Sequence, residues 1–172
     1  MERDPEVQRL IDEAAIRRLL AEYPRAIDRQ DHELLASLFH PDAIDEHGPI
    51  NGPATEFVNF MKTGSVPGHH WMHHNGTQLI DIDGDVAHTE TYTLAFYREP
   101  DADGNPSNRE VFLRVRYLDK IERRDGQWRI AHRKVAFSPC HVLTVTEEYP
   151  MWEGTIREGM VGADVATASG RH

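Results

Sequence analysis

Hydrophobic residues near the start of the chain recur every three or four positions, the spacing of one buried helix face. These positions are Val7, Leu10, Ile11, Ala14, Ala15, Leu19, Leu20, Tyr23 and Ile27. Pro24 interrupts this pattern, and because proline has no backbone N–H, we expect the helix to bend or end near Tyr23. Shorter helices are predicted over residues 31–39, with Asp31 as the N-cap, and over residues 53–62.

From residue 70 onward the hydrophobic period changes to two, which indicates β-strands. Strands are expected over residues 78–82 and 86–97, joined at Asp83-Gly84, over residues 111–123 and 128–145, joined at Asp125-Gly126, and briefly over residues 43–46. Asp-Gly is a typical hairpin turn because both residue types tolerate positive φ angles.

Helices followed by an antiparallel meander predict an α+β fold. The helices are the only cover available for the apolar face of the sheet, so a sheet that curls around them would form a cone with a cavity open at one end. We therefore expect a single α+β cone domain over residues 1–146. Residues 147–172 are small, polar and weakly patterned, and are expected to form a C-terminal tail.

Charge and composition narrow the functional classes. The 172 residues include 19 Lys and Arg against 29 Asp and Glu, a net charge of −10, which disfavours a nucleic-acid partner. No apolar run approaches the roughly 20 residues that span a bilayer, and the N-terminus has no signal-peptide pattern, so we expect no membrane association. The single cysteine, Cys140, fits a reducing, cytoplasmic compartment.

Four histidines occur within six residues: His69, His70, His73 and His74. On a strand, alternate side chains share a face, which places His70 and His74 on one side with Met72, and His69 and His73 on the other. His70 and His74 are then roughly 13 Å apart, too far for one ion, and the further ligands of a zinc site are missing. We expect no metal and, without a glycine-rich nucleotide loop, no other cofactor. Taken singly, each histidine is better explained as a rim or interface residue.

Several short motifs follow one another in a characteristic order. They are Tyr23-Pro-Arg-Ala-Ile-Asp28, Leu34-Leu-Ala-Ser-Leu-Phe39, Asp42-Ala43, Asn51-Gly52-Pro53, His70-x-x-x-His74-Asn-Gly-Thr77, Asp83-Gly84-Asp85 and Ile121-Glu-Arg-Arg-Asp-Gly-Gln-Trp128. Together they resemble the scytalone-dehydratase-like and SnoaL-like proteins of the nuclear transport factor 2-like superfamily, over residues 8–140. The resemblance implies an α+β cone with its pocket between the helices and a curved sheet, and a homo-oligomer, a trimer rather than a dimer.

In lyases of this group, an aspartate near the end of the first helix pairs with a histidine on the first long strand. The resemblance places these residues at Asp28 and His74, an active-site arginine at Arg133 and an assisting tyrosine at Tyr23. By strict alternation Arg133 faces away from Trp128, so a pocket position for Arg133 requires a β-bulge between the two. Asp28 could instead cap the next helix, and Tyr23 could be an ordinary core residue.

An aspartate that bonds one imidazole nitrogen orients the ring and makes the other nitrogen a better base. Such a base suits the removal of a proton next to a carbonyl or a leaving group. We therefore expect a cofactor-independent lyase, a dehydratase or another β-elimination enzyme, that acts on a hydrophobic cyclic small molecule. Arg133 would bind the oxygen that gains charge, and Tyr23 would protonate a departing hydroxide. The candidate substrate-binding residues are His70, Met72, Phe57, Met61 and Tyr97.

Two alternatives stay open. An isomerase or polyketide-type cyclase could use the same base without a leaving group, and a non-catalytic small-molecule binding protein could keep the cone without turnover.

Overall fold

The computed structural model describes residues 4–64, 71–103, 105–148, 150 and 152–153. These residues form three helices and seven strands: α1 (Pro5–Asp28), α2 (His32–Ser37), β1 (Phe39–His47), β2 (Ile50–Pro53), α3 (Ala54–Thr63), β3 (Trp71–Asp83), β4 (Val86–Pro100), β5 (Pro106–Arg124), β6 (Gln127–Phe137) and β7 (His141–Thr144). The predicted tail lies almost entirely outside the described residues. The domain division therefore stays a prediction.

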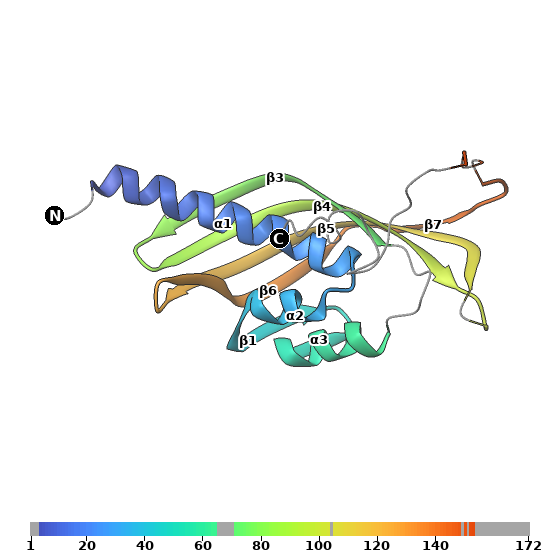
Figure 1. The fold of residues 1–172 in the computed structure, drawn as a ribbon, viewed down its shortest axis with the longest axis horizontal. Coiled ribbons are helices and arrows are strands. Elements are labelled where there is room, and N and C mark those ends of the chain that lie inside the picture. The colour runs from blue at the N-terminus through green and yellow to red at the C-terminus, as the bar shows by residue number, and fades with distance from the viewer. Residues whose placement is uncertain (1–3, 65–70, 104, 149, 151, 154–172) are drawn as a thin grey trace.

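The seven strands form one curved, unclosed sheet in the order β2-β1-β6-β5-β4-β3, with β7 paired to β5. β1 runs parallel to β6, and the other neighbours are antiparallel. Figure 1 shows α1 lying across the sheet, and α2 and α3 near β1. The predicted α+β class, with N-terminal helices against a curved sheet, is confirmed.

Helix α1 does not end near Tyr23 but continues through Pro24 to Asp28. Pro24 deprives the Leu20 carbonyl of its usual helical donor. The side-chain amide of Asn75 on β3 replaces that donor, with its Nδ2 2.9 Å from the Leu20 oxygen. The proline therefore creates a point of attachment between the helix and the sheet.

The predicted hairpins form as expected, whereas several element boundaries differ: β1, β3, β4 and β5 are longer than predicted, and β2 was not predicted. Asp125 and Gly126 have φ angles of 51° and 76°, as their tight turn requires. The expected strand over residues 128–145 is interrupted near Pro139, whose missing N–H cannot join a ladder, and forms β6 and β7. The second helix ends at Ser37 instead of residue 39, because β1 already begins at Phe39.

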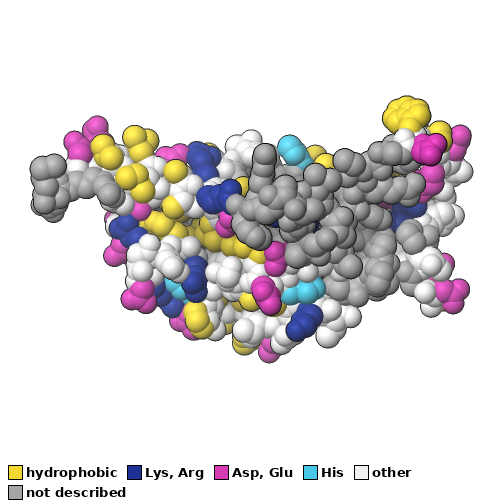
Figure 2. All heavy atoms as spheres, viewed as in Figure 1, with side chains coloured by type: hydrophobic (Ala, Val, Ile, Leu, Met, Phe, Trp, Pro, Cys, Tyr) yellow, Lys and Arg dark blue, Asp and Glu magenta, His cyan; other side chains and the backbone are white. Residues whose placement is uncertain are grey.

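The core lies between α1 and the inner face of the sheet. Its fully buried members include Ile16, Leu20, Ile121 and Ile130. The first turns of α1 extend beyond this core: Val7, Leu10 and Ile11 are 46%, 67% and 44% exposed, although they continue the apolar helix face. Figure 2 shows hydrophobic side chains exposed at this end of the molecule.

A β-bulge in β6 decides which way Arg133 points. Lys120 pairs with His132 and Ile121 pairs with Ile130, so Ala131 is an extra residue on β6. The bulge shifts the alternation by one position and turns Arg133 to the inner face, where it is 0% exposed.

None of the described helices combines the length and the apolar character needed to cross a membrane.

Candidate active site

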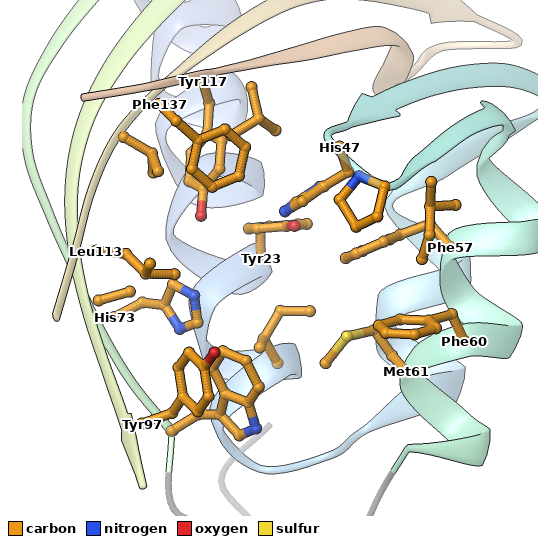
Figure 3. A pocket seen from close by; sticks show the side chains of 17 residues that line it. Tyr23, His47, Phe57, Phe60, Met61, His73, Tyr97, Leu113, Tyr117 and Phe137 are labelled. Atoms are coloured by element: carbon orange, nitrogen blue, oxygen red, sulfur yellow. The ribbon is translucent and has the colours of Figure 1, made fainter. Parts of the chain in front are cut away.

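A cavity of about 160 Å³ lies between α1, α3 and the inner face of the sheet. Its walls are mostly apolar and aromatic, with two histidines (Figure 3): Tyr23, Ile27, His47, Pro49, Ile50, Phe57, Phe60, Met61, Trp71, His73, Ala95, Tyr97, Leu113, Val115, Tyr117, Val135 and Phe137. An apolar cavity of roughly 150 Å³ holds a benzene ring. The size and lining therefore suit a small, single-ring molecule.

Asp28 and His73 form a close pair at the wall of this cavity. His73 Nδ1 lies 2.6 Å from Asp28 Oδ1, and the backbone N–H of His73 donates to Asp28 Oδ2 at 3.0 Å. The imidazole stacks on Trp71, with ring centroids 5.9 Å apart. Because a carboxylate only accepts hydrogen bonds, Nδ1 is the donor in this contact, and Nε2 is the ring nitrogen turned away from Asp28.

The predicted pairing of Asp28 with His74 is wrong. A bulge in β3 falls between Asn75, which pairs with Thr93, and Gln78, which pairs with Thr91. The inward positions are therefore 71, 73 and 75 before the bulge and 78, 80 and 82 after it. His74 lies on the outer face, beside Tyr92 and away from the cavity.

The predicted substrate-binding residues also lie partly in the cavity and partly on the outer face of the sheet. Phe57, Met61 and Tyr97 line the cavity as expected. Met72 points to the outer face and is 55% exposed, because it shares the parity of the outward His74. His70 lies outside the described residues.

Tyr23 is a wall of the cavity, and Arg133 lies behind it. The Arg133 guanidinium carbon is 3.8 Å from the centroid of the Tyr23 ring and 4.3 Å from that of Tyr117. Its Nε and Nη2 each donate to a different carboxylate oxygen of Asp119 at 2.7 Å. Desolvation acts to lower the pKa of Arg133, but the adjacent Asp119 more than offsets it and the pKa is raised.

Arg133 therefore faces inward, as the resemblance implied, but does not line the cavity. Two tyrosine rings and a carboxylate enclose its charge, so the expected contact between Arg133 and a substrate oxygen is not supported. Its effect on the site passes through the tyrosines. Burial raises the pKa of both Tyr23 and Tyr117, which keeps their hydroxyls protonated.

Further polar residues of the site were missed in the sequence, Asn75, Asp45 and His47 among them. Asn75 accepts from Thr93 Oγ1 at 2.8 Å while it holds α1, and thereby braces the strand that carries His73. Asp45 and His47 are two residues apart on β1 and form a second aspartate–histidine contact of 3.2 Å. Strand alternation places both on one face and could have identified the pair.

In the described part of the chain, no three His, Cys, Asp or Glu side chains converge as a metal site would require.

A family model for the SnoaL-like domain matches residues 8–134. The chain belongs to this family. The match spans α1 through β6 almost to its end, and so contains every wall of the cavity except Val135 and Phe137. No curated protein matches the chain.

Several solved structures share the fold of this SnoaL-like domain. A variant of Rv3472, a protein of unknown function from Mycobacterium tuberculosis, is 26% identical, with 78% of this chain and 76% of that chain covered and a TM-score of 0.63. A proposed scytalone dehydratase from Novosphingobium aromaticivorans is 24% identical (80% and 93% covered, TM-score 0.67). Hexachlorocyclohexane dehydrochlorinase LinA-type3 from Novosphingobium barchaimii is 20% identical (85% and 99% covered, TM-score 0.71).

Proposed function

We propose that this SnoaL-like domain is a cofactor-independent lyase that removes a proton and a leaving group from a hydrophobic, single-ring molecule. His73 is the base and Asp28 orients it. The observation that carries the proposal is the 2.6 Å contact between Asp28 and His73 Nδ1 at the wall of an apolar cavity.

The pair has the properties that a general base needs. Asp28 receives two donors from one residue, the imidazole and the backbone N–H of His73, so the ring is held in one orientation and one tautomer. The side chain of His73 is only 7% exposed, and water therefore competes little for Nε2. Proton transfer by a residue positioned in this way accelerates a reaction by roughly 10²- to 10⁴-fold.

When the base removes the proton, the carbonyl oxygen of the substrate gains negative charge, and two residues are candidates to bind it. Tyr23 and Tyr117 line the cavity, and burial keeps both hydroxyls protonated. A protonated hydroxyl donates a hydrogen bond to a carbonyl oxygen and stabilises the enolate that forms when the neighbouring carbon loses its proton. The substrate class that follows is a cyclic ketone with a leaving group at the β-carbon.

Turnover of 3-acetoxycyclohexanone to cyclohex-2-enone tests this function. His73→Asn removes the base, and we expect kcat to fall by about 100-fold or more, with an unchanged circular dichroism spectrum. His74→Asn is the matched control: it alters the adjacent histidine on the outer face and is expected to retain wild-type activity.

Three results would contradict the proposal. They are failure of the wild-type protein to form the enone, near wild-type turnover by the His73 variant, and an equal loss in the His74 variant. A product of unchanged mass from a ketone without a leaving group would instead indicate an isomerase.

The predicted trimer and the cytoplasmic location stay predictions. Light scattering tests the oligomeric state.

A further inference from the structure

The cavity has a second histidine, His47, on the wall opposite His73. The two residues belong to β1 and β3, which are separated by three strands in the sheet, and Figure 3 shows their imidazoles projecting into the cavity from opposite sides. We propose that His47, held by Asp45, is the general acid that protonates the leaving oxygen while His73 acts as the base. This assignment rests on the function proposed above.

The orientation of His47 is set by two contacts. Its Nδ1 faces Asp45 Oδ1 at 3.2 Å, and its ring stacks on Phe57 with centroids 4.4 Å apart and planes 11° from parallel. Because Nδ1 is turned to the carboxylate, Nε2 is the nitrogen that remains for a molecule in the cavity. The side chain is 20% exposed, so it is reachable from the cavity and still largely shielded from solvent.

Asp45, the hydrogen-bond partner of His47, lies among buried charged side chains. Asp45 is 0% exposed, and its Oδ2 has no hydrogen-bond partner in the described part of the chain. Arg133 is its register partner on β6, but two nitrogens of that guanidinium bind Asp119. Asp45 on β1 and Asp119 on β5 are the register partners of Arg133 on either side, and His47 is the side chain that hydrogen-bonds Asp45. Because a buried carboxylate without a partner is costly, this contact holds the His47 ring in place.

His73 lies in a different environment. Its partner Asp28 has a side chain that is 18% exposed and also accepts a backbone N–H, whereas Asp45 is 0% exposed. Two titratable groups of the same kind in unlike surroundings are what an acid and a base in one site require.

Tyr23 is a weaker candidate for the acid than the sequence suggested. Burial raises the pKa of its hydroxyl well above the ordinary value, and an acid of high pKa is a poor proton donor to a leaving group. The same holds for Tyr117. Both hydroxyls are better suited to hydrogen bonding with the carbonyl oxygen.

The two histidines account for both proton transfers of the elimination. His73 Nε2 takes the proton from the carbon next to the carbonyl, and the electron pair of that C–H bond forms the carbon–carbon double bond. The C–O bond at the β-carbon breaks with its pair on oxygen, which receives the proton of His47 Nε2 and departs as water. His73 ends protonated and His47 neutral, and exchange with solvent restores both.

Two probes that yield the same product distinguish the acid from the base. From 3-hydroxycyclohexanone the leaving group is hydroxide, which needs a proton. From 3-acetoxycyclohexanone it is acetate, which leaves as a stable anion. We expect His47→Gln to lower kcat by about 100-fold or more for the hydroxy ketone and by less than about 5-fold for the acetoxy ketone, because only the hydroxy ketone requires the acid. The matched control, His73→Asn, is expected to slow both reactions alike.

Each outcome has a distinct consequence. Equal losses on the two ketones in His47→Gln, or no loss on either, overturn the assignment of His47 while an inactive His73 variant still supports the base. Failure of the wild-type protein on both ketones overturns the proposed lyase and this assignment together. His47→Asn gives a second variant should the glutamine disturb stacking on Phe57, and circular dichroism verifies the fold of each. Asp45→Asn is expected to show the same preference for the acetoxy ketone, since Asp45 acts through His47.

Discussion

Asn75 is expected to matter for stability because of a proline on another element. Its amide supplies the donor that Pro24 withholds from the Leu20 carbonyl, at 2.9 Å, and its oxygen accepts from Thr93. In Asn75→Ala the buried carbonyl is left unpaired, which costs about 1–3 kcal/mol, and the loss of the Thr93 bond adds about 0.5–1.5 kcal/mol. The free energy of unfolding should fall by roughly 1.5–4.5 kcal/mol.

A double-mutant cycle isolates this interaction. In Pro24→Ala, residue 24 regains an N–H that can bond the Leu20 carbonyl within the helix, so Asn75→Ala should then cost only about 1 kcal/mol. Urea denaturation followed by circular dichroism measures all four proteins, and a change in midpoint without a change in slope is expected. Asn51→Ala is the control, because its amide bonds the Gly48 carbonyl at an exposed position. An equal cost of Asn75→Ala in both backgrounds would refute the reasoning.

Two further predictions concern the buried cluster behind the cavity. Asp119→Asn leaves the Arg133 charge without its carboxylate and should lower the free energy of unfolding by about 3–5 kcal/mol; urea midpoints measure this, and a loss below about 1 kcal/mol would contradict the importance of the ion pair. Burial raises the pKa of Tyr117 and Tyr23 above the ordinary value of about 10. Above that pH the unfolded chain therefore releases these protons before the folded one, and stability falls as pH rises by up to about 1.4 kcal/mol per pH unit for each tyrosine. Tyr117→Phe should reduce this slope by up to about 1.4 kcal/mol per pH unit over about pH 10–11.5, and an unchanged slope in urea titrations would show that Tyr117 does not contribute.

The elements were predictable because their signals are local. Apolar spacing and the Asp-Gly turns depend on a few consecutive residues, and the hairpins formed where these signals placed them. The N-cap at Asp31 also formed, with its carboxylate accepting from the Leu34 N–H. The sequence correctly predicts that Pro24 removes a helical hydrogen bond, but the replacement by Asn75 comes from another element 51 positions later and has no local signal.

The facing of individual side chains was harder to predict because one extra residue reverses it. Counting back in twos from the inward Ile80 and Ile82 leads to His74, which is the position that the resemblance also chose. The bulge before Gln78 shifts the count to His73. Gly76 within the strand is a sign of such a bulge and could have prompted the correction. For Arg133 the alternation itself indicates that a bulge is needed, and Ala131 supplies it.

Because β3 lies at the edge of the sheet, the Asp28 carboxylate has a second effect besides orienting His73. β3 is the last strand in the sheet order, and an edge strand exposes backbone groups to which another chain can add and start aggregation. Asp28 occupies one of these groups, because its Oδ2 accepts the N–H of His73. The carboxylate that orients the imidazole thus also hinders another strand from pairing with β3, so replacing it is expected to affect solubility as well as activity.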